Sequence, residues 1–187
     1  MKKIIKNSRN KIFIKGELQV YIDAANILYS QKTLKWLIDP VKIHKYFTKK
    51  FNATKTSFYT GKIGDFSKQV KFIRVLEKNG IAVVAKEVKF IKSNGAVIPK
   101  GNLDVELAID AYRFAPKYQT IALFSGDSDF SYLLERLKQD YEINSLVFST
   151  RGHISRELIL SADKYFDIRK FRAEFEYIKS GVDRSRS

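Results

Sequence analysis

Short apolar runs alternate with amphipathic segments along almost the whole chain, and this alternation restricts the fold more than any other feature of the sequence. Apolar runs typical of strands occupy residues 18–23, 54–61, 81–91, 120–125, 142–150 and 164–168. Helical patterns occupy residues 26–38, 39–51, 65–80, 102–115, 128–141 and 154–162. Strands that alternate with helices form a mainly parallel sheet with helices on both faces. The sequence therefore predicts an α/β protein with one mainly parallel central sheet.

Two local signals add detail to this prediction. Asp39 and Pro40 suit the N-cap and the first turn of the helix at 39–51. The pair Asn94-Gly95 follows the strand at 81–91 and is typical of a tight turn between antiparallel strands. We therefore expect a hairpin to follow that strand.

The chain has 187 residues, which is the length of one ordinary domain. We expect this domain to span residues 17–170, after a basic arm at residues 1–16. Residues 171–187 are expected to hold the end of a C-terminal helix and a disordered tail. No apolar run reaches the length of a membrane span, so we expect a soluble, cytoplasmic protein.

The charge balance restricts the choice of partner. The net charge is +15, which favours contact with a polyanion such as nucleic acid, although a lysine-rich composition also fits a genome bias. The chain has no cysteine, and His44 and His153 are its two imidazoles. A thiolate metal site is therefore excluded, and two histidines do not favour a histidine-rich zinc site. Any metal would have oxygen ligands, as Mg²⁺ or Mn²⁺ does.

Four aspartates are expected at one edge of the sheet. Asp23 ends the first strand, Asp127 and Asp129 follow the strand at 120–125, and Asp104 opens a helix. Parallel sheets bind ligands beyond the carboxyl ends of their strands. Each aspartate alone also fits a helix cap or a strand end, but four together repel one another unless a cation lies between them. With one or two Mg²⁺ or Mn²⁺ ions, such a set can hydrolyse a phosphodiester.

Further polar side chains are predicted near these carboxylates. Asn26 opens the helix that follows Asp23. Ser125 and Ser128 flank the turn at Asp127 and can hydrogen-bond its carboxylate or a phosphate. Four basic side chains are candidates for phosphate contacts, with a solvated surface charge or a helix start as the alternative: Lys62, Lys100, Arg151 and His153.

Several segments resemble the motifs of NYN domains, which belong to the PIN-like nuclease superfamily. VYIDAANI resembles the first motif, PKGNLDVELAIDAY the second and LFSGDSDFSYLL the third. SRELILSADKYFDI is similar to the closing segment of the LabA-like branch. Together the similarity covers residues 18–168, and the order of the three motifs is its most specific feature.

The resemblance implies a single PIN-like domain that hydrolyses phosphodiester bonds with a divalent metal, usually in RNA. By position, it implies Asp23, Asp104 and Asp127 as metal ligands, with Asp129 completing the set. It also implies that Asn26 orients Asp23 or a water. Asp110 matches the helix aspartate of the second motif, and the resemblance implies a supporting role behind the ligands.

Two departures from these motifs leave activity open. The family often has glycine where this chain has Ala24 or Ala25, and GNLDV stands in place of the commoner Gly-Val-Asp-Val. A catalytically weak or inactive RNA-binding regulator is the alternative to a ribonuclease. A haloacid-dehalogenase-type phosphatase needs Asp-x-Asp after the first strand, where this chain has DAAN. We expect RNA rather than DNA as the partner, and exposed edge strands also fit a homodimer.

Overall fold

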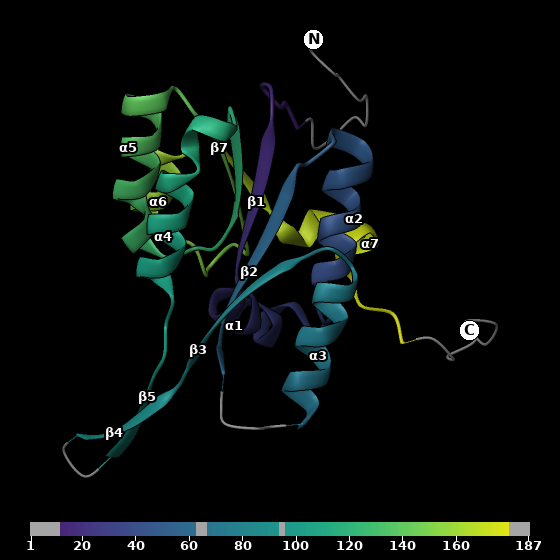
Figure 1. Ribbon diagram of the computed structural model, residues 1–187, viewed down its shortest axis with the longest axis vertical. Helices are drawn as coiled ribbons and strands as arrows, with labels where there is room; N and C mark the ends of the chain where they lie inside the picture. The colour runs from purple at the N-terminus through teal and green to yellow at the C-terminus, as the bar shows by residue number, and fades with distance from the viewer. Residues whose placement is uncertain (1–11, 63–66, 94–95, 180–187) are drawn as a thin grey trace.

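Six parallel strands form the central sheet of this protein, for which the computed structural model describes residues 12–62, 67–93 and 96–179 (Figure 1). The strand order is β3-β2-β1-β6-β7-β8. The bounds are β1 Leu18–Asp23, β2 Lys55–Lys62, β3 Ala82–Glu87, β6 Thr120–Phe124, β7 Asn144–Ser149 and β8 Lys164–Asp167. The predicted α/β fold with a parallel central sheet is confirmed.

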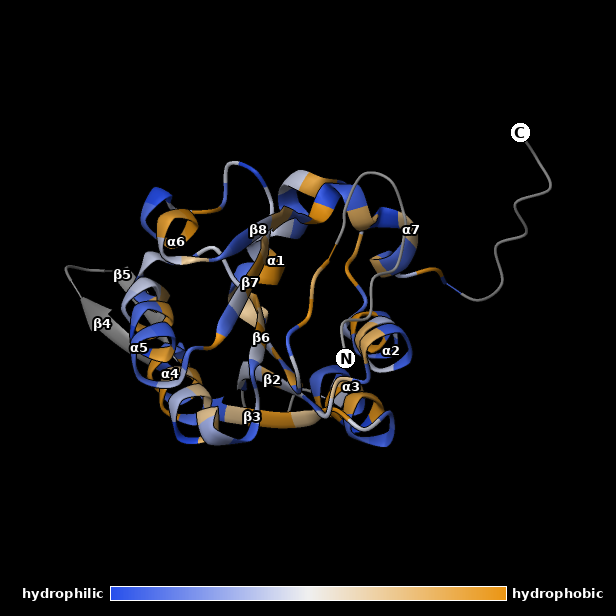
Figure 2. Cartoon of the chain, turned by 90° about the horizontal axis from the view of Figure 1, so that it is seen from above, coloured by the Kyte–Doolittle hydropathy of each residue, from blue (hydrophilic) through white to orange (hydrophobic). Residues whose placement is uncertain are grey.

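Helices cover both faces of the sheet, which Figure 2 shows from above. Helices α4, α5 and α6 lie on one face, and α2, α3 and α7 lie on the other. The helix bounds are α1 Ala24–Leu34, α2 Pro40–Phe51, α3 Ser67–Lys78, α4 Asp104–Arg113, α5 Ser131–Tyr141, α6 Arg156–Ser161 and α7 Arg172–Phe175. Short 3₁₀ turns are η1 Ala115–Lys117, η2 Ser128–Phe130 and η3 Ile168–Phe171.

Strand β1 lies at the centre of the sheet and is buried along its whole length. Its successive side chains point to opposite faces. Val20 and Ile22 pack into a core with Phe47 of α2, whereas Tyr21 packs into a second core with Leu107 of α4. A continuous apolar run is therefore needed here, because each large apolar side chain that is fully buried stabilises the fold by about 1.5–3 kcal/mol.

The predicted single strand at 81–91 is wrong, because the chain leaves the sheet at Val88. Strand β3 pairs with β2 up to Glu87, which lies opposite Lys62, and the Lys62 carbonyl then accepts from the Val88 N–H at 2.8 Å. The chain then forms β4 (Lys89–Ser93), which pairs antiparallel with β5 (Ala96–Lys100). The predicted hairpin is confirmed, and it projects away from the sheet (Figure 1).

The predicted helix at 26–38 is also shorter in the structure. It ends at Leu34, because Lys35 adopts a left-handed conformation with φ 59°. Trp36, which the longer helix would have included, lies beyond this end and is still buried. The cap at Asp39 is confirmed, since its side chain accepts from two backbone N–H groups of the first turn of α2.

Segments near both ends of the described chain pack against the domain. Ile12 and Ile14 belong to the core beside α2, and so does Phe175 of α7. Residues 1–11, 94–95 and 180–187 lie outside the described residues. They include most of the predicted arm, the predicted hairpin turn and the predicted tail. Within the described part of the chain, no helix has the length and apolarity to cross a membrane.

Candidate metal centre

The strand order reverses between β1 and β6. From β1 the chain adds β2 and β3 on one side, and it then returns to add β6, β7 and β8 on the other. Strands β1 and β6 are hydrogen-bonded neighbours, with Ile22 opposite Phe124, so the residues that follow both strands meet at one edge. Ligands of open α/β sheets bind at such a reversal, beyond the carboxyl ends of the strands.

Asp23 ends β1 at this edge and is almost completely buried. Its Oδ1 accepts from the backbone N–H groups of Ala25 at 3.0 Å and Asn26 at 3.3 Å, which makes it the N-cap of α1. Its Oδ2 accepts from the Ser125 hydroxyl at 2.9 Å. Burial raises the pKa of Asp23, the hydrogen bonds oppose this effect, and the nearby charge of Asp127 adds to it.

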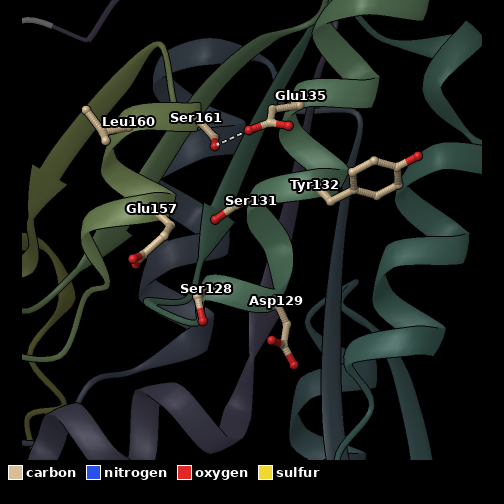
Figure 3. A pocket seen from close by; sticks show the side chains of 8 residues that line it. All are labelled: Ser128, Asp129, Ser131, Tyr132, Glu135, Glu157, Leu160 and Ser161. Atoms are coloured by element: carbon tan, nitrogen blue, oxygen red, sulfur yellow. Dashed lines mark hydrogen bonds between the residues drawn. The ribbon is translucent and has the colours of Figure 1, made fainter.

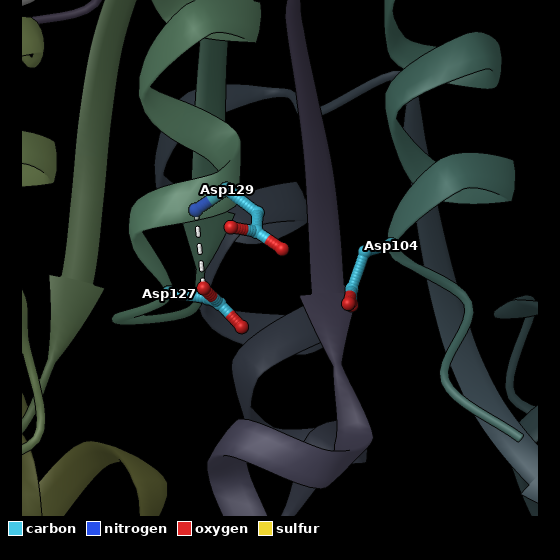
Figure 4. Close-up of side chains that lie close together, drawn as sticks. All are labelled: Asp104, Asp127 and Asp129. Atoms are coloured by element: carbon cyan, nitrogen blue, oxygen red, sulfur yellow. Dashed lines mark hydrogen bonds between the residues drawn. The ribbon is translucent and has the colours of Figure 1, made fainter. Parts of the chain in front are cut away.

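Three other carboxylates converge beside Asp23. Asp104, Asp127 and Asp129, here called the acid triad, each place one oxygen within 4.8 Å of the others (Figure 4). Asp104 is the first residue of α4, while Asp127 caps η2 and Asp129 lies within that turn. Two oxygens on opposite sides of a Mg²⁺ ion are about 4 Å apart. The acid triad can therefore hold a metal ion after small side-chain rotations.

The acid triad is electrostatically unfavourable without a cation. The pKa of Asp104 is raised to about 6, first by partial burial and then by the charges of Asp23, Asp127 and Asp129. A hydrogen bond of 2.6 Å from the Asn102 amide to Asp104 Oδ2 opposes this shift. Like charges that raise one another's pKa become favourable neighbours when a divalent cation binds between them.

The structure brings three of the four predicted ligands into one group and places Asp23 next to them. Both oxygens of Asp23 already accept hydrogen bonds, so Asp23 fixes the start of α1 and the turn after β6. The backbone N–H of Asn26 takes part in this cap. Ser125 is fully buried, and its Oγ also accepts from the Asp127 N–H at 3.2 Å. Ser125 therefore links Asp23 to the turn that carries the acid triad.

Gly126 is a site residue that the sequence reasoning missed. A Cβ at this position would lie 1.8 Å from the His153 carbonyl oxygen and 2.6 Å from Ser149 Oγ. The Gly126 carbonyl in turn accepts from the Ser155 N–H at 2.9 Å. Only glycine fits between Ser125 and Asp127, and the glycine within LFSGDSDF was the signal that could have identified it.

The structure places Asp110 outside the acid triad. Its Oδ2 accepts from the Tyr59 hydroxyl at 2.9 Å, and the Tyr59 ring stacks on Tyr21 of β1. This bond ties α4 to β2. Because α4 begins with Asp104, Asp110 helps to fix the position from which Asp104 projects.

The predicted phosphate-binding residues are distributed around the same edge. Lys62 forms an ion pair with Glu87 at 3.2 Å. Lys100 ends β5, and Arg151 is exposed in the loop after β7. His153 hydrogen-bonds the Thr33 hydroxyl of α1. Their contacts with phosphate stay predictions.

A single α/β domain with a parallel sheet and a carboxylate cluster at its switch point is the class that this fold and site define. The family description that matches is NYN domain, over residues 17–169, and the chain belongs to this family. The predicted family and its LabA-like branch are confirmed.

Two similar proteins extend this comparison. The chain is 33% identical over 169 residues to the low amplitude and bright protein LabA of Synechococcus elongatus, covering 88% of this chain and 90% of that protein. It is also similar to a crystal structure of a protein of unknown function from Vibrio parahaemolyticus, with a TM-score of 0.71 and 25% identity. That match covers 88% of this chain and 96% of the other.

Proposed function

We propose that this protein is a ribonuclease that hydrolyses phosphodiester bonds at the acid triad, with Mg²⁺ or Mn²⁺ as its cofactor. The observation that carries the proposal is the meeting of Asp104, Asp127 and Asp129 within 4.8 Å at the switch point of the sheet. Membership of the NYN family supports it. The net charge of +15 supports a polyanionic substrate.

The donor set of the acid triad fits a hard divalent cation. All three side chains offer carboxylate oxygens, which Mg²⁺ and Mn²⁺ prefer over softer metals. Bound there, Mg²⁺ or Mn²⁺ would lower the pKa of a water and stabilise the charge that develops on the phosphate oxygens.

The charge of the acid triad and the hydrogen bonds around it determine what this site can bind. Carboxylates repel a phosphodiester, so the acid triad admits the RNA backbone only after its own charge is neutralised. Asn102 holds the carboxylate of Asp104 by a hydrogen bond, and Asp127 accepts from the Asp129 N–H at 3.1 Å. Both bonds limit the rotation of the ligands. Ser125 hydrogen-bonds both the Asp23 carboxylate and the Asp127 N–H, and these bonds fix the turn that carries Asp127 and Asp129.

The test is cleavage of end-labelled single-stranded RNA with Mn²⁺ or Mg²⁺, compared with EDTA. Wild-type protein is expected to cleave only with the metal. Asp127→Asn is expected to lower the cleavage rate by about 100-fold or more, because even the hydrogen-bond partners of metal ligands contribute about 10–100-fold. Asp23→Asn is expected to lower the rate as well, because it disturbs the turn.

Asp140→Asn is the matched control, since Asp140 forms an ion pair with Arg136 on the surface of α5 and is not part of the acid triad. It is expected to keep the wild-type rate. Full activity of Asp127→Asn would contradict the assignment of the site. RNA binding without cleavage by the wild-type protein would instead favour an RNA-binding regulatory module.

A further inference from the structure

A groove of about 550 Å³ opens next to the acid triad. It lies between η2 and α5 on one side and α6 on the other (Figure 3). Its volume is in the range of sites that bind small molecules or single chemical groups. Asp129 lines the groove and also belongs to the acid triad, so a ligand in the groove would lie beside the metal centre.

The charge of the groove is opposite to that of the protein as a whole. Three carboxylates line it, from Asp129, Glu135 and Glu157, and none of the described lining residues is lysine or arginine. The chain nevertheless carries a net charge of +15. A phosphate would be repelled from this groove, whereas a neutral group with several hydrogen-bond donors would be attracted.

Two polar groups on facing elements have no hydrogen-bond partner among the described residues. Within the described part of the chain, the Glu157 carboxylate of α6 makes no hydrogen bond or ion pair. Ser131 Oγ, at the start of α5, is buried against the groove and has no hydrogen-bond partner. By contrast, Glu135 accepts from the Ser161 hydroxyl at 3.0 Å, as Figure 3 shows. Burying a hydroxyl without a partner is unfavourable, so a rotation of the Ser131 side chain that bonds its hydroxyl to a ligand in the groove would be favourable.

The edge of the groove also offers apolar surface. Tyr132 and Leu160 line it and are 71% and 74% exposed. Exposed aromatic and apolar side chains are surfaces on which unstacked nucleobases rest in single-stranded RNA complexes. The groove thus combines apolar surface with hydrogen-bond acceptors, and it lies next to a site for phosphodiester cleavage.

We propose that this groove binds the nucleobase next to the scissile phosphate and prefers bases with an exocyclic amino group over uracil. Carboxylates accept hydrogen bonds from such amino groups, as they do from cytosine N4. Uracil has a carbonyl at the same position, which a carboxylate repels. The role of the groove in RNA cleavage rests on the ribonuclease function proposed above, but base binding itself does not.

The test is an NMR titration of the ¹⁵N-labelled full chain with cytidine and, separately, with uridine, in EDTA. These nucleosides carry no phosphate and differ in the group that the groove is proposed to read. Cytidine is expected to bind in the millimolar range and to shift the amide signals of Ser128, Ser131 and Glu157. Uridine is expected to bind about tenfold more weakly, which corresponds to the loss of one good hydrogen bond to a charged group.

Two variants that each remove one carboxylate separate recognition of the base by Glu157 from a general effect of the net charge. Glu157→Ala is expected to bring the affinities for cytidine and uridine within about twofold of each other. Glu77→Ala, on the exposed surface of α3, is expected to keep the wild-type preference.

Equal affinity for the two nucleosides, signal changes away from the groove, or binding of spermidine without binding of cytidine would overturn the proposal. Because the titration contains no metal and no RNA, failure of base binding is distinguishable from failure of the nuclease function. If the protein binds cytidine as expected but never cleaves RNA, the proposal of base binding stands and the proposal of a ribonuclease is wrong.

Discussion

Replacing Asp104 by asparagine is expected to stabilise the protein at neutral pH while it removes metal binding. Asp104 carries an unfavourable charge, since its pKa is raised to about 6 by burial and by its acidic neighbours. A raised carboxyl pKa means that the folded state binds the proton more tightly than the unfolded chain does. Stability from this group is therefore present below about pH 4 and is lost as the pH rises through about 6.

The size of the effect follows from that pKa. A pKa near 6 in place of about 3.8 corresponds to roughly 3 kcal/mol before solvent screening. Because Asp104 is partly exposed, screening reduces this to about 1.5 kcal/mol. The loss of a negative charge from the first turn of α4 removes about 0.5 kcal/mol of this gain, because that charge interacts favourably with the helix dipole. The net gain of about 1 kcal/mol raises Tm by about 2–4 °C in a domain of this size.

Thermal unfolding followed by circular dichroism measures this difference. In EDTA at pH 7.5, Asp104→Asn is expected to melt above the wild type, and at pH 4 the two are expected to coincide. Excess Mn²⁺ is expected to raise the Tm of the wild type alone. Asp140→Asn is the control and is expected to show no gain, because it loses the ion pair with Arg136. An Asp104→Asn variant that melts at or below the wild type in EDTA at pH 7.5 would refute the reasoning.

Three further predictions concern the same edge of the sheet. Mn²⁺ affinity is expected to fall about tenfold between pH 7.5 and pH 5, because a proton on Asp104 competes with the metal below about pH 6; calorimetric titration measures it, and a constant affinity would argue against Asp104 as a ligand. Gly126→Ala is expected to lower Tm by more than about 5 °C, because its methyl group would meet the His153 carbonyl; an unchanged melting curve would be inconsistent with this contact. Ser125→Ala is expected to destabilise the fold by about 1–3 kcal/mol, because Asp23 Oδ2 loses its partner; urea unfolding measures it, and a loss below about 0.5 kcal/mol would show that this bond is unimportant.

Local signals predicted most of the elements. The apolar run of β1 and the Asp39-Pro40 pair each fix an element through neighbouring residues. The signals fail where distant segments decide the outcome. The predicted strand at 81–91 divides at Val88, because the residues before Val88 pair with β2 and those after it pair with β5. Helix α1 ends at Leu34, and neither a glycine nor a proline at this position signals its end.

The candidate site also has features that the local sequence predicts and features that depend on distant contacts. The positions of Asp127 and Asp104 at a strand end and a helix start were readable from the sequence, and the strand order then brings them together. The hydrogen bond that joins Ser125 to Asp23 spans 102 residues along the chain. The groove between α5 and α6 likewise depends on how these two helices pack against each other. Such distant contacts leave no periodic pattern in one sequence.

Diffraction from crystals soaked in Mn²⁺, recorded at a wavelength where manganese scatters anomalously, tests the central claim most directly. An anomalous peak is expected among the carboxylates of Asp104, Asp127 and Asp129, and no such peak is expected in crystals of Asp127→Asn. A peak at another acidic cluster, or an empty acid triad under saturating Mn²⁺, would contradict it.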